Sequence, residues 1–191
     1  MSSDASQSDA GHPLEVFKFC PRCGASGFSV HDFKSKACKA CGFVYYMNAA
    51  AATVALIQDA EGQLLVGRRA REPAKGTLDL PGGFCDIGET LEAGLAREVA
   101  EETGLEVSSA KLLFTLPNRY PYSGLVVHTV DSFFACEVAG GVAHAHEAAR
   151  PADDVAELLW LPLDKVDPEQ FGLMSIREGV KRFLAMQNNK Q

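Results

Sequence analysis

The stretch that decides the fold is GFCDIGETLEAGLAREVAEETGL, residues 83–105. Its later part predicts an amphipathic helix from Glu89 to Thr103, because large apolar residues recur at a spacing of four and a glycine follows the last of them: Leu91, Leu95, Val99 and Gly104. The segment just before it, PGG at residues 81–83, is a glycine turn. The stretch therefore indicates a tight turn that leads into one helix.

One face of this helix carries three acids. Glu98 lies three residues before Glu101 and four before Glu102, so the three carboxylates project from the same side. Like charges at these spacings destabilise a bare helix by roughly a few tenths of a kcal/mol per pair. A bound Mg²⁺ or Mn²⁺ reverses that sign, because hard cations prefer carboxylate oxygens. The helix alone fits either a solvated acidic face or a metal site.

The complete stretch matches the pattern G-x5-E-x7-R-E-U-x-E-E-x-G-U at every defined position, where U is a bulky aliphatic residue. It resembles the signature of the Nudix hydrolase family. The resemblance implies a mixed α/β fold, an α/β/α sandwich with a central mixed sheet. It also implies hydrolysis of a phosphoanhydride bond in a nucleoside diphosphate linked to another group, with Mg²⁺ or Mn²⁺ as the catalytic cofactor.

Residue matching to that signature assigns the metal ligands and the residues that orient them. The metal would be held by three carboxylates and one backbone carbonyl, those of Glu98, Glu102, Glu101 and Gly82. Arg97 and Glu89 would orient the carboxylates and complete the catalytic set. Such a site suits the reaction, since a divalent cation neutralises pyrophosphate charge and lowers the pKa of bound water.

The chain after residue 50 alternates strand-like and helix-like patterns. The expected strands are Ala51–Gln58, Gln63–Arg69, a short one before Pro81, Leu105–Leu116, Leu125–Val138 and Val155–Leu161. The first two flank a turn signal and predict a hairpin. Ser175 is expected to cap a last helix that runs to about Met186. Few helical crossovers favour a mixed or antiparallel sheet between helices.

Four of the six cysteines stand in two CxxC pairs, Cys20 with Cys23 and Cys38 with Cys41. Four thiolates make a closed tetrahedral Zn²⁺ site, which is structural because no coordination position stays open. A redox role is disfavoured, because two matched pairs fit one four-ligand site. The segment resembles the zinc ribbon that directly precedes the catalytic domain in NADH pyrophosphatase-like members of the Nudix family.

Three segments follow from these patterns. Residues 1–14 are expected to form a disordered tail, residues 15–46 the zinc ribbon and residues 47–191 the Nudix hydrolase domain. The first residues lack the basic and apolar regions of a secretory signal, and no run of about 18 apolar residues occurs. We therefore expect a cytoplasmic protein with no membrane partner, and the family resemblance implies a homodimer.

A second motif, TLPNRYPYS at residues 115–123, lies beyond the first stretch. It resembles SQPWPFPxS, a motif of NADH pyrophosphatases, at both outer prolines and the final serine. It departs from that motif at the glutamine, the tryptophan and the middle proline, so it does not single out NADH. Tyr120 and Tyr122 are candidates for stacking on a base, and Arg119 for holding a phosphate. The alternative is a proline-rich turn whose tyrosines pack on their own domain.

Many members of the family also use an acid outside the signature. The candidates here are Asp153, Asp154, Glu157 and Glu147, three of which lie shortly before Trp160. Asp154 is the preferred residue, and the nearby His144 and His146 are assigned no role.

The function predicted from the sequence is metal-dependent hydrolysis of a dinucleotide or nucleotide sugar of the NADH, ADP-ribose or FAD type. A nucleoside triphosphate is the alternative substrate. A non-enzymatic protein that senses a ligand or binds nucleic acid is the alternative class, and the complete set of carboxylates favours the enzyme. The net charge of −7 disfavours a large nucleic-acid footprint. Residues 12–48 nonetheless hold five Lys/Arg against two acids, so nucleic acid is a possible partner of the ribbon, although a packing or dimerisation surface is preferred.

Overall fold

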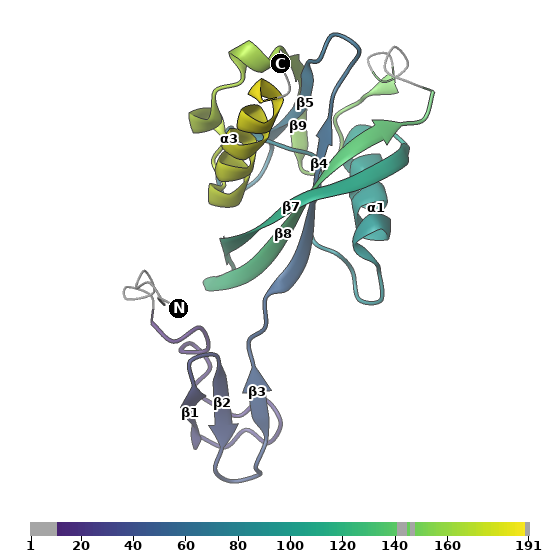
Figure 1. The fold of residues 1–191 in the computed structure, drawn as a ribbon. Coiled ribbons are helices and arrows are strands. Elements are labelled where there is room, and N and C mark those ends of the chain that lie inside the picture. The colour runs from purple at the N-terminus through teal and green to yellow at the C-terminus, as the bar shows by residue number, and fades with distance from the viewer. Residues whose placement is uncertain (1–10, 141–144, 146–147, 190–191) are drawn as a thin grey trace. The chain divides into compact units, whose positions relative to one another are not determined.

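The computed structural model describes residues 11–140, 145 and 148–189 (Figure 1). The chain forms two compact units. The first contains the residues up to Ala49 together with Pro121–Val126, and the second contains Ala50–Tyr120 and the residues from Val127 onward.

The first unit is built on a small antiparallel sheet. Its strands are β1 (Phe28–Asp32), β2 (Ser35–Cys38) and β3 (Val44–Tyr46), in the order β1-β2-β3. The core is small: Cys20, Phe28 and Cys38 are buried, and the half-buried rings of Phe17 and Phe43 pack against them. A core of this size does not supply much folding free energy, so the module needs a further source of stability.

The predicted tail is too long at its C-terminal end. Residues 1–10 lie outside the described residues, whereas Leu14 is fully buried. His12 Nε2 also lies 2.8 Å from the carbonyl oxygen of Asp32, within hydrogen-bonding distance. Burial of an apolar side chain orders the segment that carries it, so residues 12–14 belong to the folded module.

The second unit contains two three-stranded sheets and two helices. Its elements are β4 (Ala50–Ile57), β5 (Leu64–Arg69), β6 (Leu78–Asp79), α1 (Leu91–Thr103), β7 (Val107–Tyr122), β8 (Leu125–Val138), β9 (Val155–Leu161) and α3 (Met174–Asn188), with 3₁₀ turns at Leu163–Lys165 and Pro168–Gln170. The sheet orders are β4-β8-β7 and β6-β5-β9. Strand β4 runs parallel to β8, and β5 runs antiparallel to both β6 and β9.

Two separate cores lie on the two faces of these strands. On β4, Val54 and Leu56 face the core that includes α3, whereas Ala55 and Ile57 face the core that includes α1. The alternation follows from the two-residue period of a strand. Helices α1 and α3 accordingly cover opposite sides of the strands (Figure 1). The predicted α/β/α sandwich is confirmed.

The predicted hairpin of the first two strands forms only at its turn. Asp59 Oδ1 accepts a hydrogen bond from Gln63 N over 2.6 Å, and one isolated bridge joins Gln58 to Leu64. Beyond that bridge the strands separate, because β4 pairs with β8 over its whole length and β5 pairs with β9. Pairing with distant strands therefore replaces the local pairing that the turn signal indicates.

The prediction that Ser175 caps the last helix is wrong. Helix α3 begins at Met174 with Leu173 at the cap position and no side-chain cap bond. Ser175 is buried and donates its hydroxyl hydrogen bond to the buried carboxylate of Asp131 instead. The expected end of this helix near Met186 differs from the observed one by two residues.

No helix in the described part of the chain is long and apolar enough to cross a lipid bilayer.

Candidate active site and cysteine cluster

Helix α1 has a capping residue at each end. Thr90 Oγ1 accepts a hydrogen bond from Ala93 N over 3.2 Å at the start, and Gly104 ends the helix at a φ of 73°, a left-handed conformation that favours glycine. The sequence analysis placed Glu89 in the first turn of the helix. In the structure Glu89 lies just before the helix. This position lets its carboxylate turn back along the helix toward Arg97.

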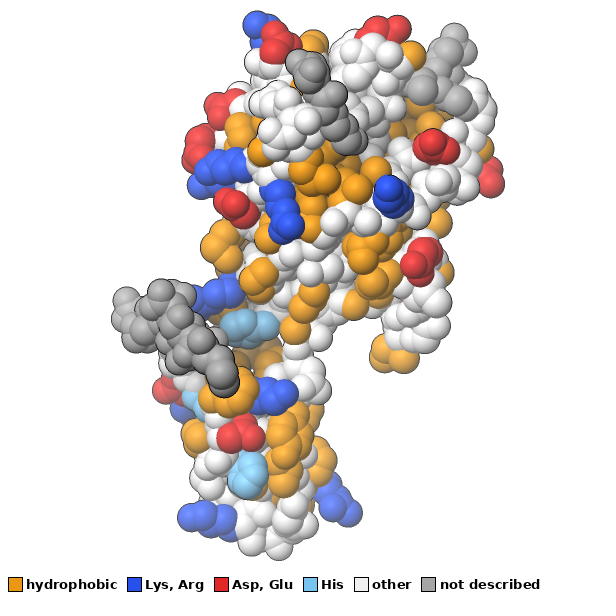
Figure 2. Space-filling view, in the orientation of Figure 1, with side chains coloured by type: hydrophobic (Ala, Val, Ile, Leu, Met, Phe, Trp, Pro, Cys, Tyr) orange, Lys and Arg blue, Asp and Glu red, His pale blue; other side chains and the backbone are white. Residues whose placement is uncertain are grey.

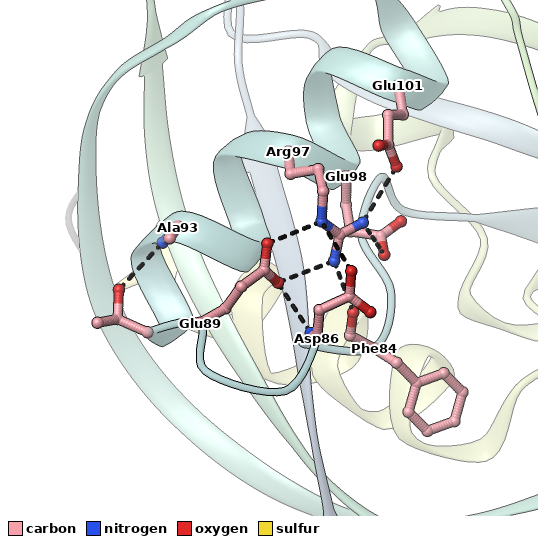
Figure 3. Close-up of polar contacts among 8 residues, drawn as sticks. Phe84, Asp86, Glu89, Ala93, Arg97, Glu98 and Glu101 are labelled. Carbon is pink, nitrogen blue, oxygen red and sulfur yellow. Dashed lines mark hydrogen bonds and ion pairs between the residues drawn. The ribbon is translucent and has the colours of Figure 1, made fainter.

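The guanidinium of Arg97 joins the loop to the helix (Figure 3). Its Nε and Nη2 donate to the two carboxylate oxygens of Glu89 over 2.9 and 3.0 Å. Its Nη1 donates to Glu98 over 2.9 Å and to Glu101 over 3.0 Å, and Nη2 also donates to the Phe84 carbonyl over 3.0 Å. The hydrogen bonds from Arg97 lower the pKa of Glu89 to about 2. Arg97 thus holds three carboxylates and one loop carbonyl.

Glu102 lies on the same helix but has no arginine partner. Its Oε2 accepts a hydrogen bond from the Gly82 backbone N–H over 2.9 Å. Burial raises the pKa of Glu102 to about 8 despite that bond, and the negative charges of Asp79, Glu98 and Asp154 add to the shift. Burial likewise raises the pKa of Glu98. Two half-buried acids of like charge thus lie near each other, which favours a cation between or beside them.

Two glycines allow the loop to approach the helix and strand β4. A Cβ on Gly82 would lie 2.1 Å from the Thr53 carbonyl oxygen, and Gly82 has a φ of 139°. A Cβ on Gly83 would lie 2.6 Å from Glu98 Cδ. The Thr53 backbone N–H donates to the Gly83 carbonyl over 2.9 Å, which fixes the loop on the edge of β4. Only glycine fits both positions without displacement of a neighbour.

Asp154 lies in the same pocket as Glu102. The pocket is also lined by Asp79, Arg68 and Arg69. Asp154 Oδ1 is 2.7 Å from Arg71 Nη1, an ion pair whose alignment does not meet the geometry of a hydrogen bond. Asp153 and Glu157 pair instead with Arg71 at 3.8 Å and with Arg68 at 3.0 Å. Glu147 and the two histidines near it lie outside the described residues.

The three expected substrate-binding residues are not brought together. The motif at residues 115–123, for which a proline-rich turn was the alternative interpretation, lies largely in the end of strand β7. Arg119 and Tyr120 therefore point to opposite faces. Arg119 is exposed, whereas the Tyr120 ring contacts the Phe84 ring edge-to-face at 5.6 Å, and its hydroxyl is 3.5 Å from Arg69 Nη2. Tyr122 is exposed and belongs to the other compact unit.

Asp79 and Arg69 are pocket residues that the sequence did not single out. They form a close ion pair between β6 and β5, and burial raises the pKa of Asp79. Arg69 Nε also donates to the Pro73 carbonyl over 2.7 Å. Asp79 faces Gly67 in the β5–β6 register, so Arg69 reaches it from two residues further along β5. The sequence does not reveal this pair until the register of the two strands is known.

The carboxylate site fits a divalent cation by its chemistry, although its oxygens are not drawn together into one cluster. Glu98 and Glu101 are held by Arg97, and Glu102 by Gly82 N–H. Among the described residues, the only group of three or more His, Cys, Asp or Glu residues whose ligand atoms all lie within 4.8 Å of one another is the set of four cysteines. Glu98 and Glu102 still repel each other, and a bound divalent cation would relieve this repulsion.

The four cysteine sulfurs fit a tetrahedral metal ion. Cys20 Sγ lies 3.7 Å from Cys41 Sγ, and Cys23 Sγ lies 3.7 Å from Cys38 Sγ. Tetrahedral zinc with bonds of about 2.3 Å separates its sulfurs by about 3.8 Å. The backbone N–H groups of Cys41 and Ala40 lower the pKa of Cys38 to about 7, which favours a thiolate. The remaining Cys85 and Cys136 stand apart as free thiols.

Two curated proteins illustrate the sequence similarity of this chain to known hydrolases. NAD-capped RNA hydrolase NudC of Vibrio vulnificus is 27% identical over 158 residues, which is 83% of this chain and 56% of that protein. ADP-ribose pyrophosphatase of Methanocaldococcus jannaschii is 34% identical over 110 residues, which is 56% of this chain and 62% of that protein. The chain thus spans little more than half the length of these curated relatives.

Solved structures share the fold. A NUDIX hydrolase from Nitrosomonas europaea has a TM-score of 0.65 at 20% identity, with 91% of this chain and 94% of that chain covered. A MutT NUDIX hydrolase from Burkholderia pseudomallei has a TM-score of 0.58 at 25% identity, with 70% and 97% covered. Residues 47–183 match the family model of the NUDIX domain. This match extends over more than half of the sequence, and the chain therefore belongs to the NUDIX domain family.

Proposed function

We propose that the chain is a metal-dependent hydrolase that cleaves a phosphoanhydride bond in a nucleoside diphosphate linked to a second group. The observation that carries this proposal is the half-buried carboxylate of Glu102, which faces further negative charge from Glu98, Asp79 and Asp154. Burial of like charges is unfavourable unless a cation or a proton neutralises them. A site of this kind suits a reaction that needs divalent cations beside phosphate oxygens.

Each residue of the site has a proposed role. Glu98 and Glu102 would hold Mg²⁺ or Mn²⁺, with Glu101 and the Gly82 carbonyl as further ligands. The bound ion would supply charge neutralisation and an acidified water. Arg97 and Glu89 would fix the direction of the ligand side chains, as their hydrogen bonds already do without an ion.

Asp154 is the proposed acceptor of the proton from the attacking water. It shares the pocket with Glu102, and its exposed side leaves it open to solvent water. General-base catalysis requires a carboxylate within reach of the water in the bound complex, and an acid at the pocket wall meets that requirement. Arg71 is the ion-pair partner of Asp154.

The proposed substrate class is a dinucleotide or nucleotide sugar. Two relatives are named for an NAD cap and for ADP-ribose, and both ligands contain a nucleoside diphosphate joined to a second group. A nucleoside triphosphate is the other substrate class to test. Tyr120 beside Phe84 is the proposed surface for a base or sugar, with Arg119 and Tyr122 kept as predictions. The structural zinc, a homodimer and a cytoplasmic location also remain predictions.

A substrate panel tests the proposal. Purified zinc-loaded protein would be assayed for phosphate-linked turnover of NADH, NAD, ADP-ribose, FAD and nucleoside triphosphates, with Mg²⁺ and with Mn²⁺. Glu102→Gln is expected to lower turnover by about 100-fold or more. Glu106→Gln is the matched control, because Glu106 is exposed and lies beyond the end of the same helix.

The outcome decides between the classes. Turnover of one diphosphate-linked compound that depends on Glu102 supports the hydrolase and names its substrate. Folded protein that turns over nothing, or a Glu102→Gln variant as active as the Glu106→Gln variant, would remove this site as the catalytic centre.

A further inference from the structure

The cysteine module, defined as residues 11–49, differs in charge from the rest of the chain. It holds five Lys/Arg and two acids, whereas residues 50–191 hold thirteen Lys/Arg and twenty-one acids. Among the described residues, no ion pair joins an acid to the exposed cations of the module: Lys18, Arg22 and Lys39. The module therefore presents positive charge that its own acids do not neutralise.

Exposed aromatic rings gather around one of its lysines. Phe33 is 77% exposed in the turn between β1 and β2, and Tyr46 is 46% exposed at the end of β3. Lys34 Nζ lies 6.0 Å from the centroid of each of these two rings. We name the three residues Phe33, Lys34 and Tyr46 the Phe33 patch. Apolar and basic side chains also lie next to each other over the surface of this module in Figure 2.

The aromatic rings of the Phe33 patch do not contribute to the folded core. The core consists of Cys20, Phe28 and Cys38, with Phe17 and Phe43 packed against it. An exposed phenylalanine at the tip of a tight hairpin is unusual, because such turns favour glycine, asparagine or aspartate. Tyr45 differs from Tyr46, since its ring contacts those of Phe17 and Phe43. Folding therefore does not explain the rings of the Phe33 patch.

We propose that the Phe33 patch binds single-stranded nucleic acid, with bases stacked on Phe33 and Tyr46 and a phosphate held by Lys34. Stacking on exposed aromatic rings beside a basic surface is how proteins hold single strands without sequence preference. Lys34 already lies against both rings, so a phosphate bound there would be next to a stacked base. The sequence alone favours a packing surface on the module. The exposure of Phe33 and Tyr46 favours nucleic acid instead, because both rings are open to a stacked base.

The net charge of −7 does not oppose this binding, because the surplus acids belong to the other part of the chain. Charges in solution are screened over about 8 Å at physiological ionic strength. Within the module itself, a bound strand would meet five Lys/Arg and two acids. The proposal does not depend on the hydrolase activity, since it concerns binding in the absence of Mg²⁺ and Mn²⁺.

Fluorescence anisotropy tests the proposal on the full chain with zinc bound. The probes are a labelled oligo(U) strand of about 12 nucleotides and a duplex of equal length, in buffer without Mg²⁺ or Mn²⁺. The Phe33→Ala/Tyr46→Ala variant is expected to bind the strand about tenfold or more weakly than the natural chain. Lys34→Gln is expected to lower the slope of log affinity against log salt by about 0.7. Leu112→Ala and Lys111→Gln are matched controls, because both residues are exposed on β7.

The controls make each result interpretable. Zinc content and a thermal melt show that each variant is folded, which is expected because Phe33 and Tyr46 are exposed. Preference for the single strand over the duplex, lost in the aromatic variant and kept in the controls, supports the proposal. Absence of binding, or equal weakening by the Leu112→Ala control, overturns it. A loss of self-association in the aromatic variant, with no change in strand binding, would also overturn it and assign the patch to a second copy of the chain.

Discussion

Arg97 and Glu89 meet through two parallel hydrogen bonds, Nε to Oε1 over 2.9 Å and Nη2 to Oε2 over 3.0 Å. Glu89 stands before helix α1 and Arg97 two turns into it, so the pair ties the loop to the helix. The remaining Nη1 then reaches Glu98 and Glu101. A single guanidinium thus sets the relative position of the loop and two proposed ligands.

Arg97→Lys is expected to lower kcat by about tenfold to 100-fold. Lysine keeps the charge, but its ammonium cannot make the two parallel bonds to Glu89. The measurement is kcat and KM at saturating Mg²⁺, with Arg22→Lys in the cysteine module as the control. Unchanged kinetics in the Arg97→Lys variant would show that charge alone suffices at this position.

Gly83→Ala is expected to weaken Mn²⁺ binding by about tenfold or more. Its new methyl would lie 2.6 Å from Glu98 Cδ and push that carboxylate out of place. Mn²⁺ affinity can be read by electron paramagnetic resonance. Gly27→Ala is the control, since a Cβ there finds an ordinary contact at 3.5 Å. Equal affinity in both variants would contradict Glu98 as a ligand.

The metal-free protein is expected to lose stability as the pH rises from about 4.5 to about 8. Glu102 has a folded pKa of about 8 against an ordinary value of 4.5, so its proton favours the folded state and is lost across this range. Each pKa unit corresponds to about 1.4 kcal/mol. Because Glu102 is only half-buried and solvent screens its charge, we count half of its pKa shift, which lowers the free energy of unfolding by about 2 kcal/mol.

Thermal melts with and without Mg²⁺ check this prediction. Glu102→Gln is expected to flatten the pH dependence of Tm, because glutamine does not titrate. Mg²⁺ at pH 8 is expected to raise Tm in the natural chain and much less in the variant. An identical pH profile for both proteins would show that Glu102 is ionised at ordinary pH.

Removal of zinc is expected to unfold the cysteine module while the second unit stays folded. The module has few buried apolar residues, namely Leu14 and a cluster of three of which two are cysteines, so metal binding would supply most of its folding free energy. Hydrogen exchange after treatment with a zinc chelator should show lost protection in β1 to β3 and kept protection in β4 to β9. Cys41→Ser should reproduce this pattern without a chelator.

Ser175→Ala is expected to destabilise the second unit by about 1–3 kcal/mol. Asp131 is buried and accepts hydroxyl hydrogen bonds from Thr129 and Ser175, so the variant leaves a buried carboxylate with one donor fewer. Urea unfolding measures the change. Ser108→Ala on an exposed part of β7 is the control. An equally small effect of both substitutions would mean that the hydrogen bond from Ser175 to Asp131 contributes little to stability.

Local apolar pattern was sufficient to place several elements along the chain, although it did not show which strands pair. The expected strands Leu125–Val138 and Val155–Leu161 agree with β8 and β9 at both ends. Helix α1 begins two residues later than expected, because Thr90 caps it and leaves Glu89 outside. The family resemblance, rather than periodicity, supplied the roles of Arg97 and the three glutamates.

Features that depend on distant partners were not predictable in the same way. Serine is a favourable residue type for a helix cap, but the Ser175 hydroxyl donates its hydrogen bond to Asp131, which is 44 residues away in the sequence. The Asp59–Gly62 turn indicated a hairpin, and β8 and β9 separated its strands. Pro117 and Pro121 suggested a turn at a place where strand β7 continues. Because the segment was not recognised as a strand, the opposite directions of Arg119 and Tyr120 were not predicted.

The contact between Gly82 and Thr53 has a consequence for how this protein can change over evolutionary time. No side chain separates the loop backbone from the carbonyl of β4, so the loop moves with the strand. A substitution in the interior that shifts β4 by a fraction of an ångström would displace the amide that binds Glu102 by a similar amount. Variation inside the domain is therefore expected to alter reaction rate before it alters melting temperature, and pairs of compensating interior substitutions should restore both.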